Sequence, residues 1–166
     1  MIADQRRGTV TRLDDGRQRL EFRREWPDPV DDVWAALTEP DRMARWIGTY
    51  EGERAVGATG TFTMTHEDEP TGESMRIVEC VPPRRLVVEW VQQGTDAWRI
   101  DLDLTTEGER TVLRFVQVFG ADADVTDYAM GWHWYLEKFG AEVDGSPAPG
   151  SWDAFRAEAG PAYGRG

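Results

Sequence analysis

Cysteine and histidine are scarce in this chain of 166 residues. Cys80 is the single cysteine, so no disulfide can form within the chain, and a reducing cytoplasm is the expected location. Because Cys80 ends a strand-like stretch, we expect a buried structural thiol rather than a nucleophile. His66 and His133 lie far apart and outside any His-x-x-x-His pattern, so neither a metal site nor a cofactor is expected.

Long apolar runs are also missing. No stretch approaches the roughly 18–20 apolar residues of a membrane span, and the opening residues, MIADQRRG, lack the apolar segment of a secretory signal. Nineteen basic residues stand against 31 acidic ones, which gives a formal net charge of −12. Since an acidic surface repels phosphate groups, we expect neither nucleic-acid binding nor membrane insertion.

The common catalytic motifs are absent. Without Gly-x-Ser-x-Gly, Walker-type or Gly-x-Gly-x-x-Gly patterns, hydrolase, phosphate-binding and dinucleotide-binding functions have no support. His133 is the best single acid–base candidate, because it titrates near neutrality. If Trp132 points from its helix into the core of the domain, the next residue, His133, is rotated by about 100° around the helix axis. This rotation favours an exposed or rim position for His133. We therefore predict no catalytic residue.

What the chain does contain is apolar and aromatic. Forty per cent of the residues are hydrophobic, among them eight Trp, six Phe and four Tyr, which is enough for the core of one domain. Asp-Asp-Gly at 14–16 separates two extended runs and predicts a hairpin. Asp28 is placed to cap a helix that begins at Pro29, and residues 41–46 suggest a second short helix.

In the rest of the chain, the spacing of the apolar residues changes from the period of strands to the period of a helix. From 50 to 119, apolar residues alternate with polar ones in several short runs separated by turns, which indicates an antiparallel sheet. Residues 128–143 then show the three- and four-residue spacing of a long helix, with Thr126 near its N-cap, and 152–159 suggest a last short helix. This order predicts an α+β fold in which one helix covers one face of the sheet.

The face that the sheet turns towards the long helix is bulky. The side chains expected there are Phe62, Met64, Met75, Ile77, Trp90, Trp98, Ile100, Leu102, Leu113 and Phe115 from the sheet, and Tyr128, Trp132, Leu136 and Phe139 from the helix. They can interdigitate fully, or a curved sheet can leave a cavity; the residues alone leave both packings open. Gln117 shares this face and could orient a ligand, although a rim position near the strand end is favoured.

Two motifs carry a resemblance to a known family. DPVDDVWAALTEPDRMARW at 28–46 and PPRRLVVEW at 82–90 are similar to the START-like (SRPBCC, or Bet v 1-like) superfamily. Within it, they most resemble the family named for the activator of the heat-shock-protein-90 ATPase. The resemblance covers residues 18–145, preceded by a hairpin extension at 1–17 and followed by a tail at 146–166.

The resemblance implies a helix-grip fold, in which a curved antiparallel sheet wraps around a long C-terminal helix and two short helices follow the first core strand. It also implies a cavity between the sheet and the long helix, where relatives bind apolar molecules. Trp46 would lie near its mouth. The residues expected to contact a ligand are Trp46, Phe62, Met64, Met75, Ile77, Trp90, Trp98, Ile100, Phe115, Gln117, Tyr128, Trp132, Leu136 and Phe139.

Three hypotheses about function follow. The first is non-catalytic binding of a small apolar or aromatic molecule. The second is a cyclase, aromatase or hydrolase acting on a polyketide-like substrate, which needs polar groups inside the cavity; the expected interior offers few. The third is a co-chaperone role, which is doubtful because the extra N-terminal domain of the eukaryotic activators has no counterpart in this sequence. A stress-related sequestering role and a homodimer also remain open.

Overall fold

Eight antiparallel strands form one sheet in the computed structural model, which describes residues 7–91 and 98–163. Their order across the sheet is β1-β2-β8-β7-β6-β5-β4-β3. The strands are β1 (Thr9–Arg12), β2 (Gln18–Trp26), β3 (Thr49–Glu51), β4 (Thr59–Thr63), β5 (Gly72–Val81), β6 (Arg85–Val91), β7 (Trp98–Glu107) and β8 (Arg110–Phe119). The Asp-Asp-Gly turn joins β1 to β2 as expected.

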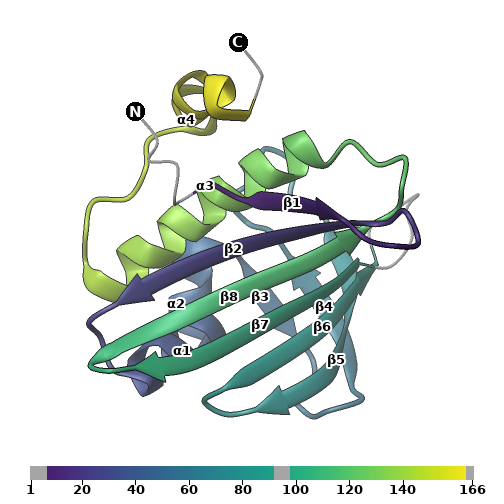
Figure 1. The fold of residues 1–166 in the computed structure, drawn as a ribbon. Helices are drawn as coiled ribbons and strands as arrows, with labels where there is room; N and C mark the ends of the chain where they lie inside the picture. The colour runs from purple at the N-terminus through teal and green to yellow at the C-terminus, as the bar shows by residue number, and fades with distance from the viewer. Residues whose placement is uncertain (1–6, 92–97, 164–166) are drawn as a thin grey trace.

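The strands form because apolar and polar residues alternate along them. In β8, Leu113 and Phe115 are buried, whereas Arg114 between them is exposed. A break in register between Ile77 and Glu79 marks a bulge in β5, and a bulge bends its strand and increases the local twist. The sheet curls so strongly that β3 and β4 lie behind β7 and β8 (Figure 1).

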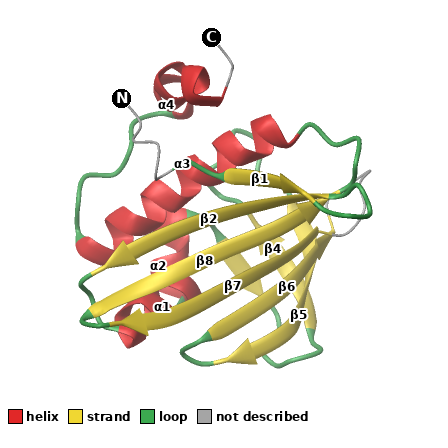
Figure 2. Cartoon of the chain, in the orientation of Figure 1, coloured by secondary structure: helices red, strands yellow, loops and turns green. Residues whose placement is uncertain are grey.

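Four α-helices complete the described part of the fold: α1 (Val30–Thr38), α2 (Pro40–Trp46), α3 (Val125–Asp144) and α4 (Trp152–Ala159), with a 3₁₀ turn at Gly160–Tyr163. The long α3 lies across the open side of the curled sheet, with α1 and α2 at one end (Figure 2). The α+β helix-grip architecture expected from the sequence is therefore confirmed. None of these helices is both long and apolar enough to cross a membrane.

One helix start differs from the sequence-based expectation. Asp28 does not cap α1, whose N-cap is Pro29 and makes no side-chain bond. Helix α3 begins in the expected region near Thr126: its N-cap is Asp124, whose carboxylate accepts from the Thr126 amide at 3.2 Å. At its other end, Gly145 adopts a left-handed φ of 73°, the conformation in which a glycine ends a helix.

Candidate ligand-binding site

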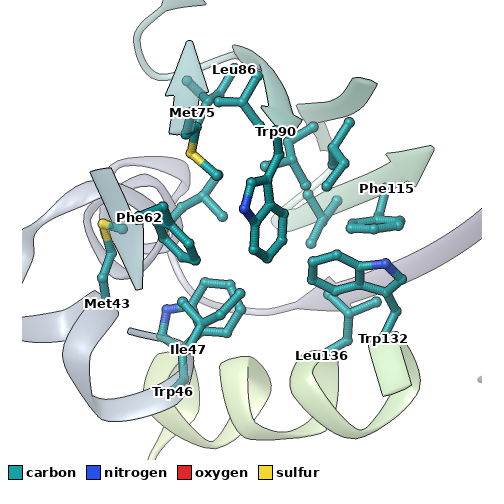
Figure 3. Close-up of a pocket in the computed structure, with 15 residues that line it drawn as sticks. Met43, Trp46, Ile47, Phe62, Met75, Leu86, Trp90, Phe115, Trp132 and Leu136 are labelled. Carbon is teal, nitrogen blue, oxygen red and sulfur yellow. The ribbon is translucent and has the colours of Figure 1, made fainter. Parts of the chain in front are cut away.

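An inner chamber of about 90 Å³ lies between the concave face of the sheet and helix α3, and α1 and α2 contribute to its wall (Figure 3). Its lining residues are Leu37, Met43, Trp46, Ile47, Phe62, Met75, Leu86, Val88, Trp90, Ile100, Leu102, Leu113, Phe115, Trp132 and Leu136. None of these side chains is titratable. The wall therefore suits an uncharged apolar guest and supplies no group for acid–base chemistry.

A second hollow, the outer groove, has a volume of about 290 Å³ and leads from this wall towards the edge formed by α1, α2 and β5. The groove is lined by Trp34, Leu37, Thr38, Glu39, Pro40, Met43, Tyr50, Arg54, Phe62, Met75, Ile77, Cys80, Pro82, Leu86 and Val88. Six apolar residues, Leu37, Met43, Phe62, Met75, Leu86 and Val88, line both spaces. The chamber and the groove therefore share one wall.

The sizes of the two spaces limit what they could hold. A cavity of roughly 150 Å³ can bind benzene. Since the chamber is smaller than that, a ligand larger than a few atoms must reach from the chamber into the groove. Two methionines, Met43 and Met75, stand on the shared wall, and their unbranched side chains adapt to different contents. At the groove, the Arg54 guanidinium donates to the Thr38 carbonyl at 2.7 Å and covers the ring of Tyr50.

Specific contacts hold α1 and α2 in place. The indole N–H of Trp46 donates to the Ala36 carbonyl at 2.9 Å, which joins α2 to α1. Arg42 then bridges both to α3, because its guanidinium lies 2.8 Å from a carboxylate oxygen of Asp32 and 2.8 Å from one of Glu142. The Trp46 hydrogen bond and the Arg42 ion pairs thus hold the two helices that close one end of the chamber.

The structure brings eight of the predicted ligand-contacting residues onto the chamber wall: Trp46, Phe62, Met75, Trp90, Ile100, Phe115, Trp132 and Leu136. Ile77 lines the outer groove instead. Trp46 was expected near the mouth, but it is 6% exposed and packs on Phe139 inside the core. The exposed Arg54 and the half-buried Tyr50 line the outer groove.

Four other predicted residues do not line the chamber. Tyr128 is 37% exposed and packs against Trp98 and Phe119 at the far end of α3, which draws Trp98 away from the chamber too. Phe139 is fully buried between Trp26 and Trp46. Met64 follows the end of β4 and is half-buried outside the wall. These residues share the apolar face but not the chamber, because the face extends beyond the part of it that encloses space.

Gln117 does not lie at a rim. It is fully buried in β8, and its carbonyl oxygen Oε1 accepts a hydrogen bond of 2.8 Å from the indole N–H of Trp132. The Trp132 donor fixes which end of the amide is the oxygen. The other end, Nε2, has no acceptor among the described residues.

Seven chamber residues were missing from the predicted set: Leu37, Met43, Ile47, Leu86, Val88, Leu102 and Leu113. Leu102 and Leu113 were predicted on the inward face of the sheet, in phase with their neighbours on β7 and β8, but not among the residues that contact a ligand. Leu86 and Val88 are in phase with Trp90 on β6 in the same way. The helical residues could not be found from periodicity, because it does not tell which end of the sheet α1 and α2 close.

His133 is fully buried, which corrects the expected exposed or rim position. The side of α3 that carries it is covered by Phe22 of β2 and by Phe155 and Tyr163 of the tail. Its Nδ1 lies 2.8 Å from the Tyr163 hydroxyl and its Nε2 lies 3.2 Å from a carboxylate oxygen of Glu137. With Glu137 ionised, Nε2 carries the proton and Nδ1 accepts from Tyr163.

A second polar cluster surrounds Lys138, the single lysine of the chain. Its Nζ lies 2.6 Å from Nδ1 of His66 and 4.3 Å from the centre of the Trp134 ring. Burial, opposed by the nearby charge of Glu67, lowers the pKa of Lys138 to about 8. Burial, with a hydrogen bond to Glu67, raises the pKa of the Tyr135 hydroxyl above its ordinary value. This cluster lies apart from the chamber wall.

The described residues, 7–91 and 98–163, show the surroundings of Cys80 and the groups that could bind a metal ion. Cys80 is half-buried at the outer groove rather than fully buried, and burial raises the pKa of its thiol. A raised pKa keeps the thiol protonated and poorly nucleophilic. No group of three or more His, Cys, Asp or Glu in this part of the chain could hold a metal ion.

Comparisons with known proteins agree with this architecture. Residues 28–144 match the model of a family described as Activator of Hsp90 ATPase homolog 1-like protein. The crystal structure of CalU16 from Micromonospora echinospora is 25% identical, with a TM-score of 0.73 and coverage of 95% of this chain and 93% of that one. A search of curated proteins found no significant match.

Two further structures resemble the chain. The protein encoded by BPP1335 from Bordetella parapertussis is 28% identical, with a TM-score of 0.76 and coverage of 95% of this chain and 90% of that one. DynU16, from the dynemicin biosynthetic locus, is 23% identical, with a TM-score of 0.68 and coverage of 80% of this chain and 50% of that one. At this identity DynU16 supports the fold alone.

Proposed function

Because the chain belongs to the Activator of Hsp90 ATPase homolog 1-like family, we propose that it binds a small hydrophobic or aromatic ligand between its sheet and helix α3. The observation that carries the proposal is the inner chamber, whose fifteen lining side chains include no charged or titratable group. Burying an apolar molecule there gains roughly 25 cal/mol for each Å² removed from water. The single Cys80 favours a cytoplasmic setting for this role.

The side chains of the chamber wall favour non-catalytic ligand binding over the alternative of a cyclase-type enzyme. A cyclase, aromatase or hydrolase must place acids, bases or hydrogen-bonding groups on its substrate. In the chamber, the polar atoms of the lining side chains are the indole nitrogens of Trp46, Trp90 and Trp132. Indole nitrogens donate a hydrogen bond but do not titrate near neutrality, so they cannot transfer the protons of a ligand. The N–H groups of Trp46 and Trp132 already donate to the Ala36 carbonyl and to Gln117, so neither is available to a ligand.

Naphthalene is a suitable probe, because it is apolar, aromatic and uncharged. We expect saturable binding in isothermal titration calorimetry and a rise in the melting temperature with naphthalene concentration, as mass action requires. Val88→Phe fills the wall shared by the chamber and the groove, and we expect it to weaken binding by about 10-fold or more.

The matched control is Val56→Phe, because Val56 is 60% exposed and lies outside both spaces. We expect this variant to bind naphthalene as the unmodified chain does. The proposal fails if naphthalene and a wider set of apolar probes bind nowhere. It also fails if Val56→Phe weakens binding as much as Val88→Phe does.

A further inference from the structure

Two buried hydrogen-bond donors on the concave face of the sheet have no acceptor. Trp90 of β6 is 1% exposed and Gln117 of β8 is fully buried, yet Trp90 Nε1 and Gln117 Nε2 meet no partner among the described residues. A buried donor without an acceptor costs about 1–3 kcal/mol, and native proteins contain few of them. Both unpaired atoms are donors, so an acceptor is the missing group.

Trp90 is the donor nearer to a ligand, because its ring lines the inner chamber. Its Nε1 is itself buried, so a ligand reaches this atom only when a neighbouring side chain moves aside. Figure 3 shows its nitrogen on the edge of the ring that faces Phe62. The two rings meet edge to face, with centres 5.1 Å apart and planes inclined by 73°. An aromatic face is a much weaker acceptor than an oxygen atom, so the Phe62 ring does not replace a full hydrogen bond.

The side chains and the sheet strands of the chamber offer no oxygen to accept a hydrogen bond from a ligand. No lining side chain carries an oxygen. Strands β6, β7 and β8 each have a hydrogen-bonded neighbour on both sides, so their backbone carbonyls are engaged in the sheet. A hydroxyl group in the chamber could accept from Trp90 but would leave its own hydrogen unpaired. A carboxylate placed beside Trp90 would have no cation on the chamber wall to balance its charge, because Arg54 lines the outer groove instead.

We propose that the ligand of the inner chamber is a neutral apolar molecule whose carbonyl oxygen accepts a hydrogen bond from Nε1 of Trp90. The ligand class is therefore ketones, quinones and esters on a small cyclic skeleton, in preference to the matching alcohols, phenols and acids. This inference rests on the proposed function and adds to it the chemistry by which one apolar molecule is preferred over another.

The test compares three molecules with one skeleton: indane, 1-indanone and 1-indanol. Calorimetry of the unmodified chain should show 1-indanone binding about 5- to 150-fold more tightly than indane, the ratio that one newly satisfied buried donor gives. 1-Indanol should bind more weakly than 1-indanone. In Trp90→Phe, which lacks the donor, the preference for 1-indanone over indane should fall below about 2-fold.

Trp98→Phe is the matched control, because Trp98 packs on Trp90 at 5.8 Å but does not line the chamber. It should keep the preference for the ketone. A second readout needs no variant: the indole ¹H–¹⁵N resonance of Trp90 should move downfield with 1-indanone and much less with indane. This readout also serves if Trp90→Phe does not fold.

Each outcome bears on one claim. If indane and 1-indanone bind equally and the Trp90 resonance responds alike to both, the inference is overturned while the proposed function stands. Binding of 1-indanol as tight as that of 1-indanone overturns the preference for carbonyl compounds. If none of the three molecules binds and naphthalene does not bind either, the proposed function itself falls.

Discussion

Lys138 shows how one side chain acquires unusual chemistry from residues far away in the sequence. Its ammonium group is held between His66, from the turn after β4, and the ring of Trp134, one helical turn earlier on α3. Nε2 of His66 lies 3.0 Å from the Ala44 carbonyl oxygen. Because a carbonyl oxygen only accepts hydrogen bonds, Nε2 carries the hydrogen and donates it. Nδ1 is then free to accept from the lysine.

We expect Lys138 to titrate near pH 8, because burial disfavours its charged form and lowers its pKa to about 8 from the usual 10.5. Reductive ¹³C-methylation followed by NMR measures this directly, since the chain has one lysine. The same resonance in urea should titrate at the ordinary value. A native titration near pH 10.5 would contradict the burial of Lys138.

The sign of the effect on stability follows from the same shift. Between about pH 8 and pH 10.5 the unfolded chain holds a proton on Lys138 that the folded chain has lost, so this residue makes the free energy of unfolding rise with pH. Lys138→Met keeps an unbranched apolar side chain and should remove that rise. Urea denaturation of both proteins at pH 8 and pH 10 checks it.

At the scale of elements, two glycines differ in the space that a larger side chain would find around them. A Cβ added to Gly131, in the middle of α3, would meet nothing within 4 Å. A Cβ added to Gly60 of β4 would lie 2.5 Å from the Glu51 carbonyl oxygen of the neighbouring strand β3. The first glycine weakens its helix without a packing reason, whereas the second allows two strands to approach.

We expect Gly131→Ala to stabilise the protein by about 0.5–1 kcal/mol, because alanine loses less backbone entropy than glycine in a helix interior. Gly60→Ala should destabilise it, since the added methyl group clashes with backbone atoms that cannot move separately. Urea denaturation measures both free energies of unfolding. A loss of stability in Gly131→Ala would show that this part of α3 is more crowded than the structure indicates.

The element α3 also shows why helix faces are hard to assign from sequence. Trp132 and Leu136 face the chamber as the apolar spacing predicted. Tyr128 belongs to the same stripe, but it packs on Trp98 and Phe119 and is partly exposed. His133, on another side, is covered by the tail. Periodicity gives the direction of each side chain around the helix. It does not show how far the sheet covers α3, or that a second segment covers another side of it.

At the scale of the whole molecule, Tyr163 connects parts of the chain that are 155 residues apart. The Gly8 amide donates to its hydroxyl oxygen at 2.9 Å, and the hydroxyl lies 2.8 Å from Nδ1 of the buried His133. Beside it, the Arg7 guanidinium donates to the Ala162 carbonyl at 2.6 Å. The beginning and the end of the described chain are thus fastened to the same face of α3.

We expect Tyr163→Phe to destabilise the protein by about 1–3 kcal/mol, because it removes both hydrogen bonds and leaves the buried Nδ1 of His133 without this donor. The control is Tyr50→Phe, which removes an exposed bond to the Glu53 carbonyl and should cost less than about 0.5 kcal/mol. Urea denaturation at pH 7 compares the two. Equal effects would contradict a fastening role for Tyr163.

The stabilising contribution of Tyr163 should also depend on pH. Burial raises its pKa to about 12, although the Gly8 hydrogen bond and nearby arginines oppose the rise. The folded chain therefore keeps the phenolic proton where the unfolded chain loses it. The contribution is complete below about pH 10 and is lost as the pH rises from 10 to 12, so the difference between the unmodified chain and Tyr163→Phe should shrink over that range.

The sequence by itself determined the order of the elements and the apolar face of each. Alternation placed Phe62, Trp90 and Phe115 on one side of the sheet, and the spacing of Trp132 and Leu136 directed them towards it, because these periods follow from local backbone geometry. The motifs at 28–46 and 82–90 then indicated the family, which the match over residues 28–144 confirms.

Only the tertiary structure decided where space remains and what covers the other faces. The chamber depends on how far the sheet curls and where α1 and α2 close it, so Leu37 and Met43 could not be predicted as its wall. Burial of His133 depends on the tail, and the unpaired N–H of Trp90 depends on which atoms fail to meet it. Such properties arise from contacts between distant segments, and no local pattern encodes them.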